Sequence, residues 1–413
     1  MGTSRFISSR MAGSRIYLDH LSTTPLLPAA REAMLPFLGE QFGSAGSIHQ
    51  WGLAARDAVN TARAQFAAFT NAESPESIVF TSSGTEAVNL ALKGLTWHPR
   101  RKGSHIVCSA IEHPAVLGAL EFLKRDGITC TRVPVDRTGR IDPERVRAAM
   151  TDETFLLATH AANYDLGTIQ PLAELGQIAN DAGATFLVEA NYAGGWLPLD
   201  VQALGIDLLT LAPHRFHGPK GVGVLYRNRR TRLAPLIHGG VQEGGLRAGA
   251  ENVAAIVGAG VAADAATHEL PARNRHVFAM QQRIWSGVQR SIEQVHLNGP
   301  EPGPDRWVAN LNISPAGTEG EGLMLMCDAQ GIAIGSGTAC TLKALKASPV
   351  LEAIGVSAEI AKAAVLISPG TDTTADEADR FVALFAKMVH RLRAMSPSWE
   401  EFTSVRAASS RKA

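Results

Sequence analysis

Short apolar runs alternate with amphipathic segments along most of the chain, and this rhythm constrains the fold more than any other feature. Runs such as Ser77–Thr81 and Thr185–Glu189 have the length and composition of strands. Segments such as Pro171–Ala182 place apolar residues at helical spacing. This alternation is typical of an α/β protein with a mainly parallel sheet. Further predicted strands are His105–Ser109, Thr129–Pro134, Phe155–Ala158, Leu208–Ala212 and Val222–Tyr226, and further predicted helices are Glu86–Leu95, His113–Arg125, Pro143–Met150 and Val253–His268.

The pattern changes near Leu270, where a second region begins. A predicted long helix over about Leu270–Val295 leads into strand-like segments at Trp307–Ile313 and Ile332–Ser336. Two more predicted helices follow, at about Ala347–Ile354 and Asp376–Ala394. We therefore predict a disordered leader (1–15), a large α/β domain (16–268), a small α+β domain (269–400) with which residues 16–30 also pack, and a disordered tail (401–413).

The composition of the chain excludes several classes of protein. Its 39 basic and 39 acidic residues give zero formal charge, so there is no basic field for nucleic acid and no polybasic membrane signal. No apolar run is expected to span a membrane. The four cysteines, Cys108, Cys130, Cys327 and Cys340, form no CxxC pair, which argues against a disulfide scaffold and a structural zinc site. We expect a soluble cytoplasmic protein, with the first three cysteines in its core.

Short motifs that follow one another in order carry a family resemblance. They are Tyr17-Leu18-Asp19 with Thr23-Thr24-Pro25, Phe80 to Glu86 (FTSSGTE) with Asn89, Ile111 to Val116 (IEHPAV), Ala212 to Gly221 (APHRFHGPKG), His238 to Asn252 (HGGVQEGGLRAGAEN) and Ser336 to Thr341 (SGTACT). From about Tyr17 to Trp399 the chain resembles the cysteine desulfurases, pyridoxal-phosphate (PLP) enzymes of the class V aminotransferase type. The resemblance implies the fold type I architecture of PLP-dependent transferases, with a large α/β and a smaller α+β domain, and a homodimer.

The resemblance also implies roles for individual residues. Gly84 and Thr85 fall in the turn that binds the cofactor phosphate at a helix N-terminus. His113 falls on the histidine that stacks on the cofactor ring, and Asn163 on a further residue of the cofactor pocket. Cys340 falls on the loop cysteine that accepts sulfur as a persulfide.

Arg215 departs from the family pattern at its central position. After the histidine that corresponds to His214, the family has a lysine whose amine forms a Schiff base with PLP. A lysine amine can lose its proton and attack an aldehyde, whereas a guanidinium stays protonated and cannot form that imine. Lys220 has a counterpart in the family beside the Schiff-base lysine, so we predict a structural role for it.

Other departures surround the same pocket. Glu189 replaces the aspartate that pairs with the pyridine nitrogen, and Tyr192 replaces the glutamine that bonds the ring hydroxyl. Ala212 and Ala250 stand where the family has hydroxyl side chains that bind the phosphate. Leu366 stands where the family has the arginine that binds the substrate carboxylate. Each charge-assisted hydrogen bond to a phosphate is worth roughly 1.5–3 kcal/mol. We therefore expect no bound cofactor, or PLP held only without a covalent bond.

Two interpretations of the altered pocket remain open. Arg215 either clamps an anion in a repurposed site or pairs with Glu189 and fills the space that PLP would occupy. His113 and His214 act either as acid–base groups or as packed remnants of the ancestral site. Tyr192, like Tyr164, is predicted to fill the cofactor cavity, because an empty cavity of that size would destabilise the core. No HxxxH pair is present, and we predict no metal.

Three functions are compatible with these residues. The first is a dimeric scaffold, sulfur relay through Cys340, or regulator that no longer performs PLP-dependent desulfuration. The second is an enzyme with new chemistry on an anionic small molecule, and the third is a working desulfurase that binds PLP non-covalently. The partners expected are a second copy of the chain and a sulfur-acceptor protein or a competent desulfurase, without nucleic acid or membrane.

Overall fold

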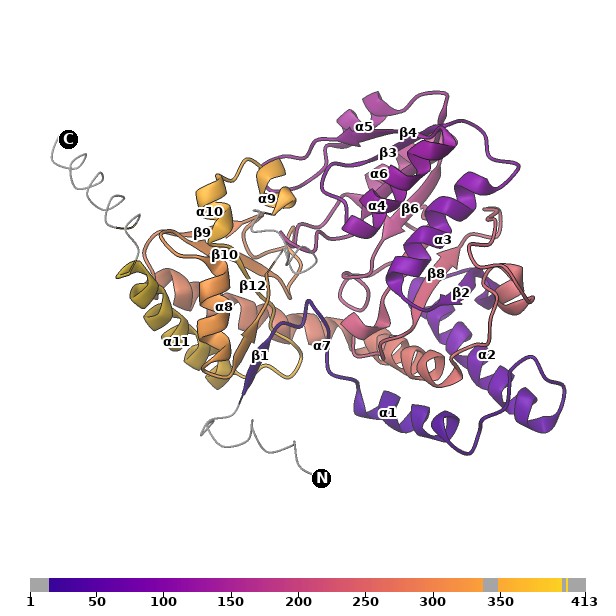
Figure 1. Ribbon diagram of the computed structural model, residues 1–413, viewed down its shortest axis with the longest axis horizontal. Helices are drawn as coiled ribbons and strands as arrows, with labels where there is room; N and C mark the ends of the chain where they lie inside the picture. The colour runs from indigo at the N-terminus through magenta and orange to yellow at the C-terminus, as the bar shows by residue number, and fades with distance from the viewer. Residues whose placement is uncertain (1–14, 337–347, 396–398, 400–413) are drawn as a thin grey trace. The chain divides into compact units, whose positions relative to one another are not determined.

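The computed structural model describes residues 15–336, 348–395 and 399, which form two compact units (Figure 1). The larger unit comprises Thr23–Asn163 and Thr168–Ala272. The smaller unit comprises the described residues up to Ser22, the short segment Tyr164–Gly167, and the described residues from Arg273 onward. Tyr164–Gly167 thus belongs with the smaller unit, although it lies inside the segment that the sequence assigns to the large domain.

The larger unit is built on a seven-stranded sheet in the order β2-β8-β7-β6-β5-β3-β4. Neighbouring strands from β7 to β4 pair in parallel, and β8 pairs antiparallel with both β2 and β7. The predicted mainly parallel α/β sheet is therefore confirmed. The strands are β2 (Ile78–Thr81), β3 (His105–Ser109), β4 (Thr129–Val133), β5 (Thr154–His160), β6 (Thr185–Glu189), β7 (Leu208–Leu211) and β8 (Gly223–Arg227).

Helices pack on this sheet and bury its apolar face. α3 and α4 lie across the sheet, where Leu90, Cys108 and Leu120 join one buried cluster (Figure 1). Ser83 caps α3 by accepting a hydrogen bond from the Glu86 N–H at 3.1 Å. The helices are α1 (Pro28–Met34), α2 (Gln50–Thr70), α3 (Gly84–Trp97), α4 (Pro114–Leu123), α5 (Pro143–Ala149) and α6 (Leu172–Asp181).

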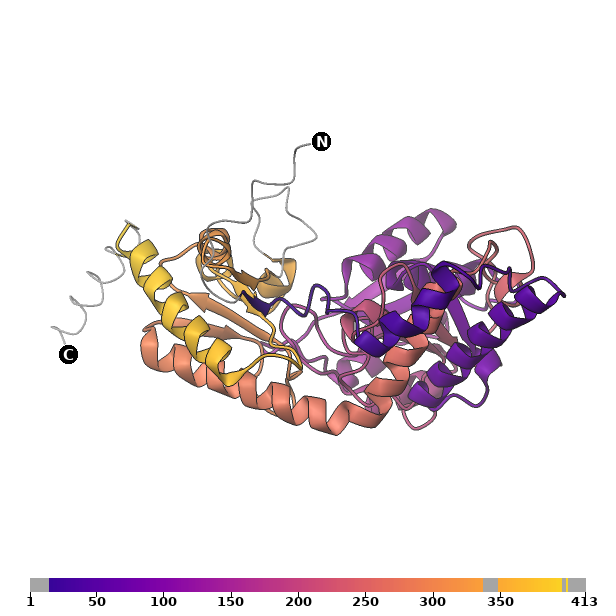
Figure 2. The same ribbon diagram turned by 90° about the horizontal axis from the view of Figure 1, so that it is seen from below.

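Helix α7 (Val253–Ser291) is one continuous helix with Pro271 inside it (Figure 2). Proline inside a helix removes one helical donor and clashes with the preceding turn. From the change of pattern near Leu270 we predicted two helices with a break there. That prediction is wrong. Burial of alanines before the proline and of Val277 and Ile284 after it offsets the local cost. By length and composition α7 is apolar enough to span a membrane, contrary to the expectation for this chain, but half of the apolar window is buried inside the structure, as in a core helix.

The smaller unit combines two short sheets with helices. β1 (Ile16–Leu18) pairs in parallel with β11 (Ile332–Ile334), whereas Thr23 and the residues after it belong to the larger unit. An antiparallel sheet has the order β12-β10-β9, formed by Val365–Ile367, Leu311–Pro315 and Val295–Asn298. The helices are α8 (Gly320–Asp328), α9 (Pro349–Ala353), α10 (Ala358–Lys362) and α11 (Ala375–Arg393).

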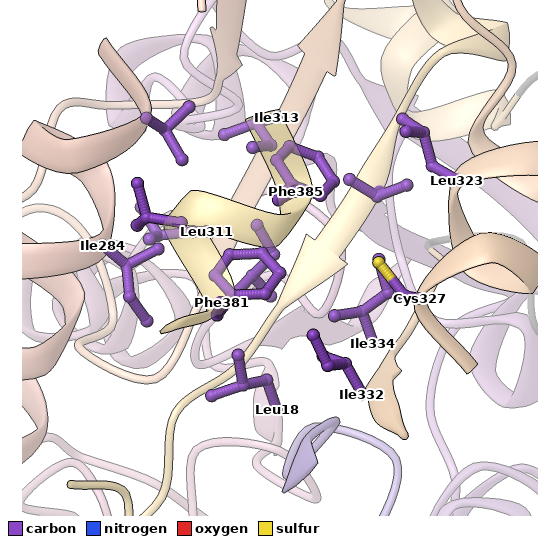
Figure 3. Packing of buried hydrophobic residues seen from close by; sticks show 14 of the residues in the cluster. Leu18, Ile284, Leu311, Ile313, Leu323, Cys327, Ile332, Ile334, Phe381 and Phe385 are labelled. Carbon is purple, nitrogen blue, oxygen red and sulfur yellow. The ribbon is translucent and has the colours of Figure 1, made fainter. Parts of the chain in front are cut away.

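One apolar core holds the smaller unit together (Figure 3). Phe381 and Phe385 of α11 stack with ring centroids 5.1 Å apart and pack beside Ile284 of α7. Thr374 and Glu377 form a capping box that fixes the start of α11. The predicted α+β character of this region is therefore confirmed.

Candidate active site

The candidate site lies at the carboxyl ends of the parallel strands of the larger unit. Open α/β sheets bind their ligands at this edge. β3 leads to His113, β5 to Asn163 and β7 to Arg215, while β6 ends at Glu189. Residues far apart in the sequence are thus delivered to one edge by the sheet topology.

A row of polar side chains crosses this edge. His160, Glu189 and Thr210 are Cα partners on β5, β6 and β7, so their side chains share one face of the sheet. Glu112 Oε1 accepts hydrogen bonds from the backbone N–H of His160 at 3.2 Å and from its Nδ1 at 2.9 Å. The Gln170 amide nitrogen lies 3.0 Å from His160 Nε2. Donation by Gln170 to Nε2 places the imidazole proton on Nδ1, where it bonds Glu112.

Glu189 is a buried acid whose proton affinity is raised. Its side chain is 2% exposed, and one carboxylate oxygen accepts the Asn191 N–H at 3.1 Å. Burial first, and the neighbouring Glu112 second, raise the pKa of Glu189 to about 7, against the lowering influence of His160, Asn191 and Arg215. Near neutral pH this carboxyl group can therefore hold or release a proton.

The Arg215 side chain lies against an aromatic ring. Its guanidinium carbon is 3.5 Å from the centre of the Tyr192 ring, a cation–π contact. Trp196 Nε1 donates a hydrogen bond to the Arg215 carbonyl oxygen at 3.1 Å and so fixes the backbone of the loop that follows β7. Tyr192 is 7% exposed, and its ring lies 5.7 Å from that of His113. The pairing of Arg215 with Glu189 stays a prediction: the charge of Arg215 lowers the pKa of Glu189, but by less than burial raises it.

His113 begins α4 and contributes a neutral imidazole to the site. Its Nδ1 accepts the Ala115 N–H at 3.1 Å, which caps the helix. Burial, and then the charge of Arg215, lower the pKa of His113 to about 4. The ring is thus neutral at pH 7 and can accept a proton, but it is not available as an imidazolium donor.

His214 precedes Arg215 in the chain, and, as at His113, burial and the Arg215 charge lower its pKa. Its Nδ1 lies 3.2 Å from Thr23 Oγ1, and its carbonyl oxygen accepts the Thr24 N–H at 2.9 Å. Burial, followed by the charges of Arg215 and Lys220, lowers the pKa of His214 to about 4. These contacts fix the loop of β7 against the segment that precedes α1.

The turn before α3 brings backbone and side chain into close approach. Gly84 is the first residue of α3, and a Cβ placed there would lie 2.4 Å from Asn191 Oδ1. Only glycine therefore allows this packing. Thr85 follows on the exposed side of the first helical turn. Asn163 lies deeper, fully buried, and its amide donates to the Ile111 carbonyl at 3.1 Å.

Some buried polar atoms at this edge lack a partner. Asn191 Oδ1, Thr210 Oγ1 and Glu112 Oε2 make no hydrogen bond to any described residue. Buried polar atoms in proteins are nearly always paired with protein, water or ligand. Three such atoms around Glu189 therefore indicate that the edge receives a polar ligand or ordered water.

Tyr164, which we predicted to fill the cofactor cavity, is part of the smaller unit. The residue after it, Asp165, accepts hydrogen bonds from Asn312 Nδ2 at 2.6 Å and from Ser348 Oγ in the same unit. Burial raises the pKa of Asp165 to about 6. Cys340 lies outside the described residues. Within the parts of the chain that the structure describes, no group of three or more His, Cys, Asp and Glu side chains is arranged to hold a metal.

Two cavities of the larger unit lie outside this row of side chains. One of about 1260 Å³ opens at the amino ends of the parallel strands and is lined by Thr154, Thr185 and Asp207 among others. Another, of about 200 Å³, lies beside the turn before α3 and is lined by Ser82, Arg247 and further residues. The larger of these two cavities lies at the opposite end of the strands from Glu189. Open α/β sheets bind their ligands at the carboxyl ends of the strands, so we place the chemistry there although this cavity is large.

Sequence reasoning missed several residues of the site. Thr210 carried a usable signal, because it is a polar residue inside the apolar run of β7 and is the register partner of Glu189 on the next strand. The sequence around Asn191 and Trp196 did not indicate a role in the site, because their contacts with Gly84 and Arg215 depend on how the loop after β6 packs. The bond between Glu112 and His160 joins the ends of two strands and becomes visible only with the register.

The fold and the site together define the class of protein. The family model described as "Aminotransferase class-V" matches residues 16–381. The chain therefore belongs to the class V aminotransferases, and its fold is the type I fold of PLP-dependent transferases.

Individual relatives narrow this class to one family. The chain is 40% identical to "Cysteine desulfurase IscS" of Dictyoglomus turgidum over 387 residues, which covers 94% of this chain and 98% of that protein. It is 41% identical to "Cysteine desulfurase IscS" of Methanosarcina thermophila, over 92% of this chain and 94% of that one. The chain belongs to the cysteine desulfurase family.

Solved structures agree with this assignment. A protein described as "NIFS-LIKE PROTEIN" superposes with a TM-score of 0.85 at 32% identity, over 91% of this chain and 100% of that one. The structure described as "SspA in complex with cysteine" superposes with a TM-score of 0.75 at 30% identity, over 87% of this chain and 100% of that one.

These relationships correct our expectation about the cofactor. The sequence led us to expect no cofactor, because the lysine and several phosphate ligands are replaced. That expectation is wrong at the level of the family, since the relatives are cysteine desulfurases and this family depends on PLP. The relationship therefore assigns the site to PLP.

The residues present fit PLP in part. The N-terminus of α3, with its close approach at Gly84, suits a phosphate, and the buried acid Glu189 suits a ring nitrogen. The unpaired oxygens of Asn191 and Thr210 leave acceptors for further polar contacts. Arg215 does not suit the covalent link that lysine supplies. The site thus fits PLP held by polar contacts.

Proposed function

We propose that the chain is a cysteine desulfurase homologue that holds PLP without a covalent link and does not itself release sulfur from free cysteine. It acts instead as a dimeric scaffold or regulatory partner in sulfur transfer in the cytoplasm. A sulfur-acceptor protein or a competent desulfurase is the partner in this proposal. The proposal rests on the Arg215 guanidinium, which lies against the Tyr192 ring. By the resemblance, residue 215 is the position of the family's Schiff-base lysine.

When bound, PLP supplies the electron-withdrawing ring on which the family's chemistry at an amino acid Cα depends. Glu189 would hold a proton facing the ring nitrogen, because its raised pKa lets it exchange one near neutrality. His113 would pack on the ring as a neutral imidazole. The N–H groups at the start of α3, near Gly84, would bind the phosphate.

A further feature supports the loss of desulfuration. By the resemblance, Leu366 of β12 takes the place of the arginine that clamps the substrate carboxylate in the family. Its side chain is 5% exposed and lies in the hydrogen-bonded sheet of the smaller unit. A leucine side chain cannot make the bidentate contact that orients an amino acid.

The test is sulfide release from cysteine by the purified chain saturated with PLP. The IscS of Dictyoglomus turgidum serves as a positive control under the same conditions. We expect background sulfide from this chain alone, and a changed rate of sulfide release or sulfur transfer when it is mixed with the competent enzyme. Multiple turnovers by this chain alone would overturn the loss of desulfuration, and an unchanged rate in the mixture would overturn the partner role.

A further inference from the structure

Two cysteines of the larger unit face each other away from the row of polar side chains. Cys108 lies on β3 and Cys130 on β4, and their sulfur atoms are 3.5 Å apart. Cys130 is the register partner of Ile106 on the neighbouring parallel strand, so the two thiols are diagonal neighbours on one face of the sheet. To become bonded, the two sulfur atoms must close from 3.5 Å to about 2 Å, and the edge strand β4 must move toward β3, because diagonal neighbours lie farther apart than directly opposed residues.

The two thiols differ in access. Cys108 is fully buried in the cluster beneath α3 and α4. Cys130 is partly exposed, because β4 is the edge strand of the sheet. A reagent in solvent therefore reaches Cys130 first, and Cys108 lies behind it.

The surroundings of Cys130 favour its thiolate. The hydrogen bond with Cys108 is the first cause that lowers the pKa of Cys130, and the cations Arg132 and Lys124 lower it further. The same bond and burial raise the pKa of Cys108. The partly exposed Cys130 is thus placed as the attacking thiol, and the buried Cys108 behind it as the resolving thiol.

We propose that Cys108 and Cys130 form a redox-active dithiol that reacts with low-molecular-weight disulfides. The Cys130 thiolate attacks the disulfide RSSR, which forms a mixed disulfide at Cys130 and releases one RS⁻. Cys108 then attacks the Cys130 sulfur, forms the Cys108–Cys130 bond and releases the second RS⁻. Each RS⁻ takes up one of the two cysteine protons, so RSSR and two thiols give one protein disulfide and two RSH. The oxidised pair joins β3 to β4 just ahead of Glu112 and His113.

The experiment uses the full chain with Cys340→Ser, so that Cys108, Cys130 and Cys327 are its only thiols. The protein is treated with glutathione disulfide, alkylated, and analysed by intact mass and peptide mapping. Cys327 is the matched control, because it is buried, has no cysteine neighbour among the residues that the structure describes, and has a pKa that burial raises to about 12. We expect a Cys108–Cys130 disulfide and an unmodified Cys327.

Two variants separate the roles of the two thiols. Adding Cys108→Ser should stop the reaction at a stable mixed disulfide on Cys130, formed at about the rate of the parent protein. Adding Cys130→Ser should leave Cys108 reduced and slow its modification at least about tenfold. Circular dichroism confirms that each variant is folded. Modification of Cys130 no faster than that of Cys327, or a mixed disulfide at Cys130 that persists while Cys108 is present, would overturn the proposal.

Discussion

The Arg215 guanidinium carbon lies 3.5 Å from the centre of the Tyr192 ring, at the carboxyl ends of the parallel strands. The family resemblance predicts that both residues depart from the family pattern, and in the structure they contact each other. A cation taken out of water needs a compensating partner, and the ring face of Tyr192 is one such partner. We therefore expect the two positions to be structurally linked rather than independent.

Removing the ring of Tyr192 should destabilise the larger unit. Tyr192→Leu leaves a cavity and removes the cation–π partner of Arg215, so we expect a loss of about 2–4 kcal/mol in the free energy of unfolding. Tyr192→Phe keeps the ring face and is the matched control, with a clearly smaller loss. Chemical denaturation of the three proteins measures the difference. Equal losses for the two variants would show that the ring face does not support Arg215.

The raised pKa of Glu189 makes stability depend on pH. Between the unfolded value of 4.5 and the folded value of about 7, the folded state binds more protons than the unfolded state, so stability falls as pH rises through this window. Glu189→Gln cannot titrate and should lack this loss. Between pH 4.5 and pH 8, the free energy of unfolding of the variant should rise by about 2–3 kcal/mol relative to that of the natural chain.

Denaturation of both proteins at pH 5 and pH 8 checks this expectation. The natural chain also contains His113 and His214, whose lowered pKa values act in the opposite direction below pH 6.5. Because both histidines remain in the variant, the difference between the two proteins isolates Glu189. If Glu189→Gln were less stable than the natural chain at pH 8, this would show instead that an ionised Glu189 is paired with Arg215.

A methyl group at Gly84 should disturb the turn before α3. Gly84→Ala places a Cβ 2.4 Å from Asn191 Oδ1, and we expect a loss of about 1–3 kcal/mol together with weaker PLP binding. Gly118→Ala in α4 is the matched control, because a Cβ there meets nothing within 4 Å. The control should be neutral or stabilising by about 0.5–1 kcal/mol. Equal behaviour of the two variants in denaturation and in equilibrium dialysis with PLP would contradict the close approach.

The sequence predicted the sheet well because buried parallel strands read as short apolar runs. It failed at α7, where the change of pattern near Leu270 suggested a break, whereas the structure has one helix that continues through Pro271. It placed Glu189 and Arg215 in one pocket by resemblance, but not the direction of the Arg215 side chain, which depends on the ring of Tyr192. The unpaired Asn191 oxygen was also out of reach, since loop packing decides it.

The most direct test of the central claim is borohydride trapping of bound PLP. Reduction fixes PLP to any lysine that is linked to it as an imine. We predict that this chain, loaded with PLP and reduced, loses all of its cofactor on denaturation, whereas the Arg215→Lys protein retains it on residue 215. Mass spectrometry of the peptides gives the answer. A pyridoxyl group on Lys220 or another lysine of the natural chain would contradict the account, because the cofactor would then be covalently anchored after all.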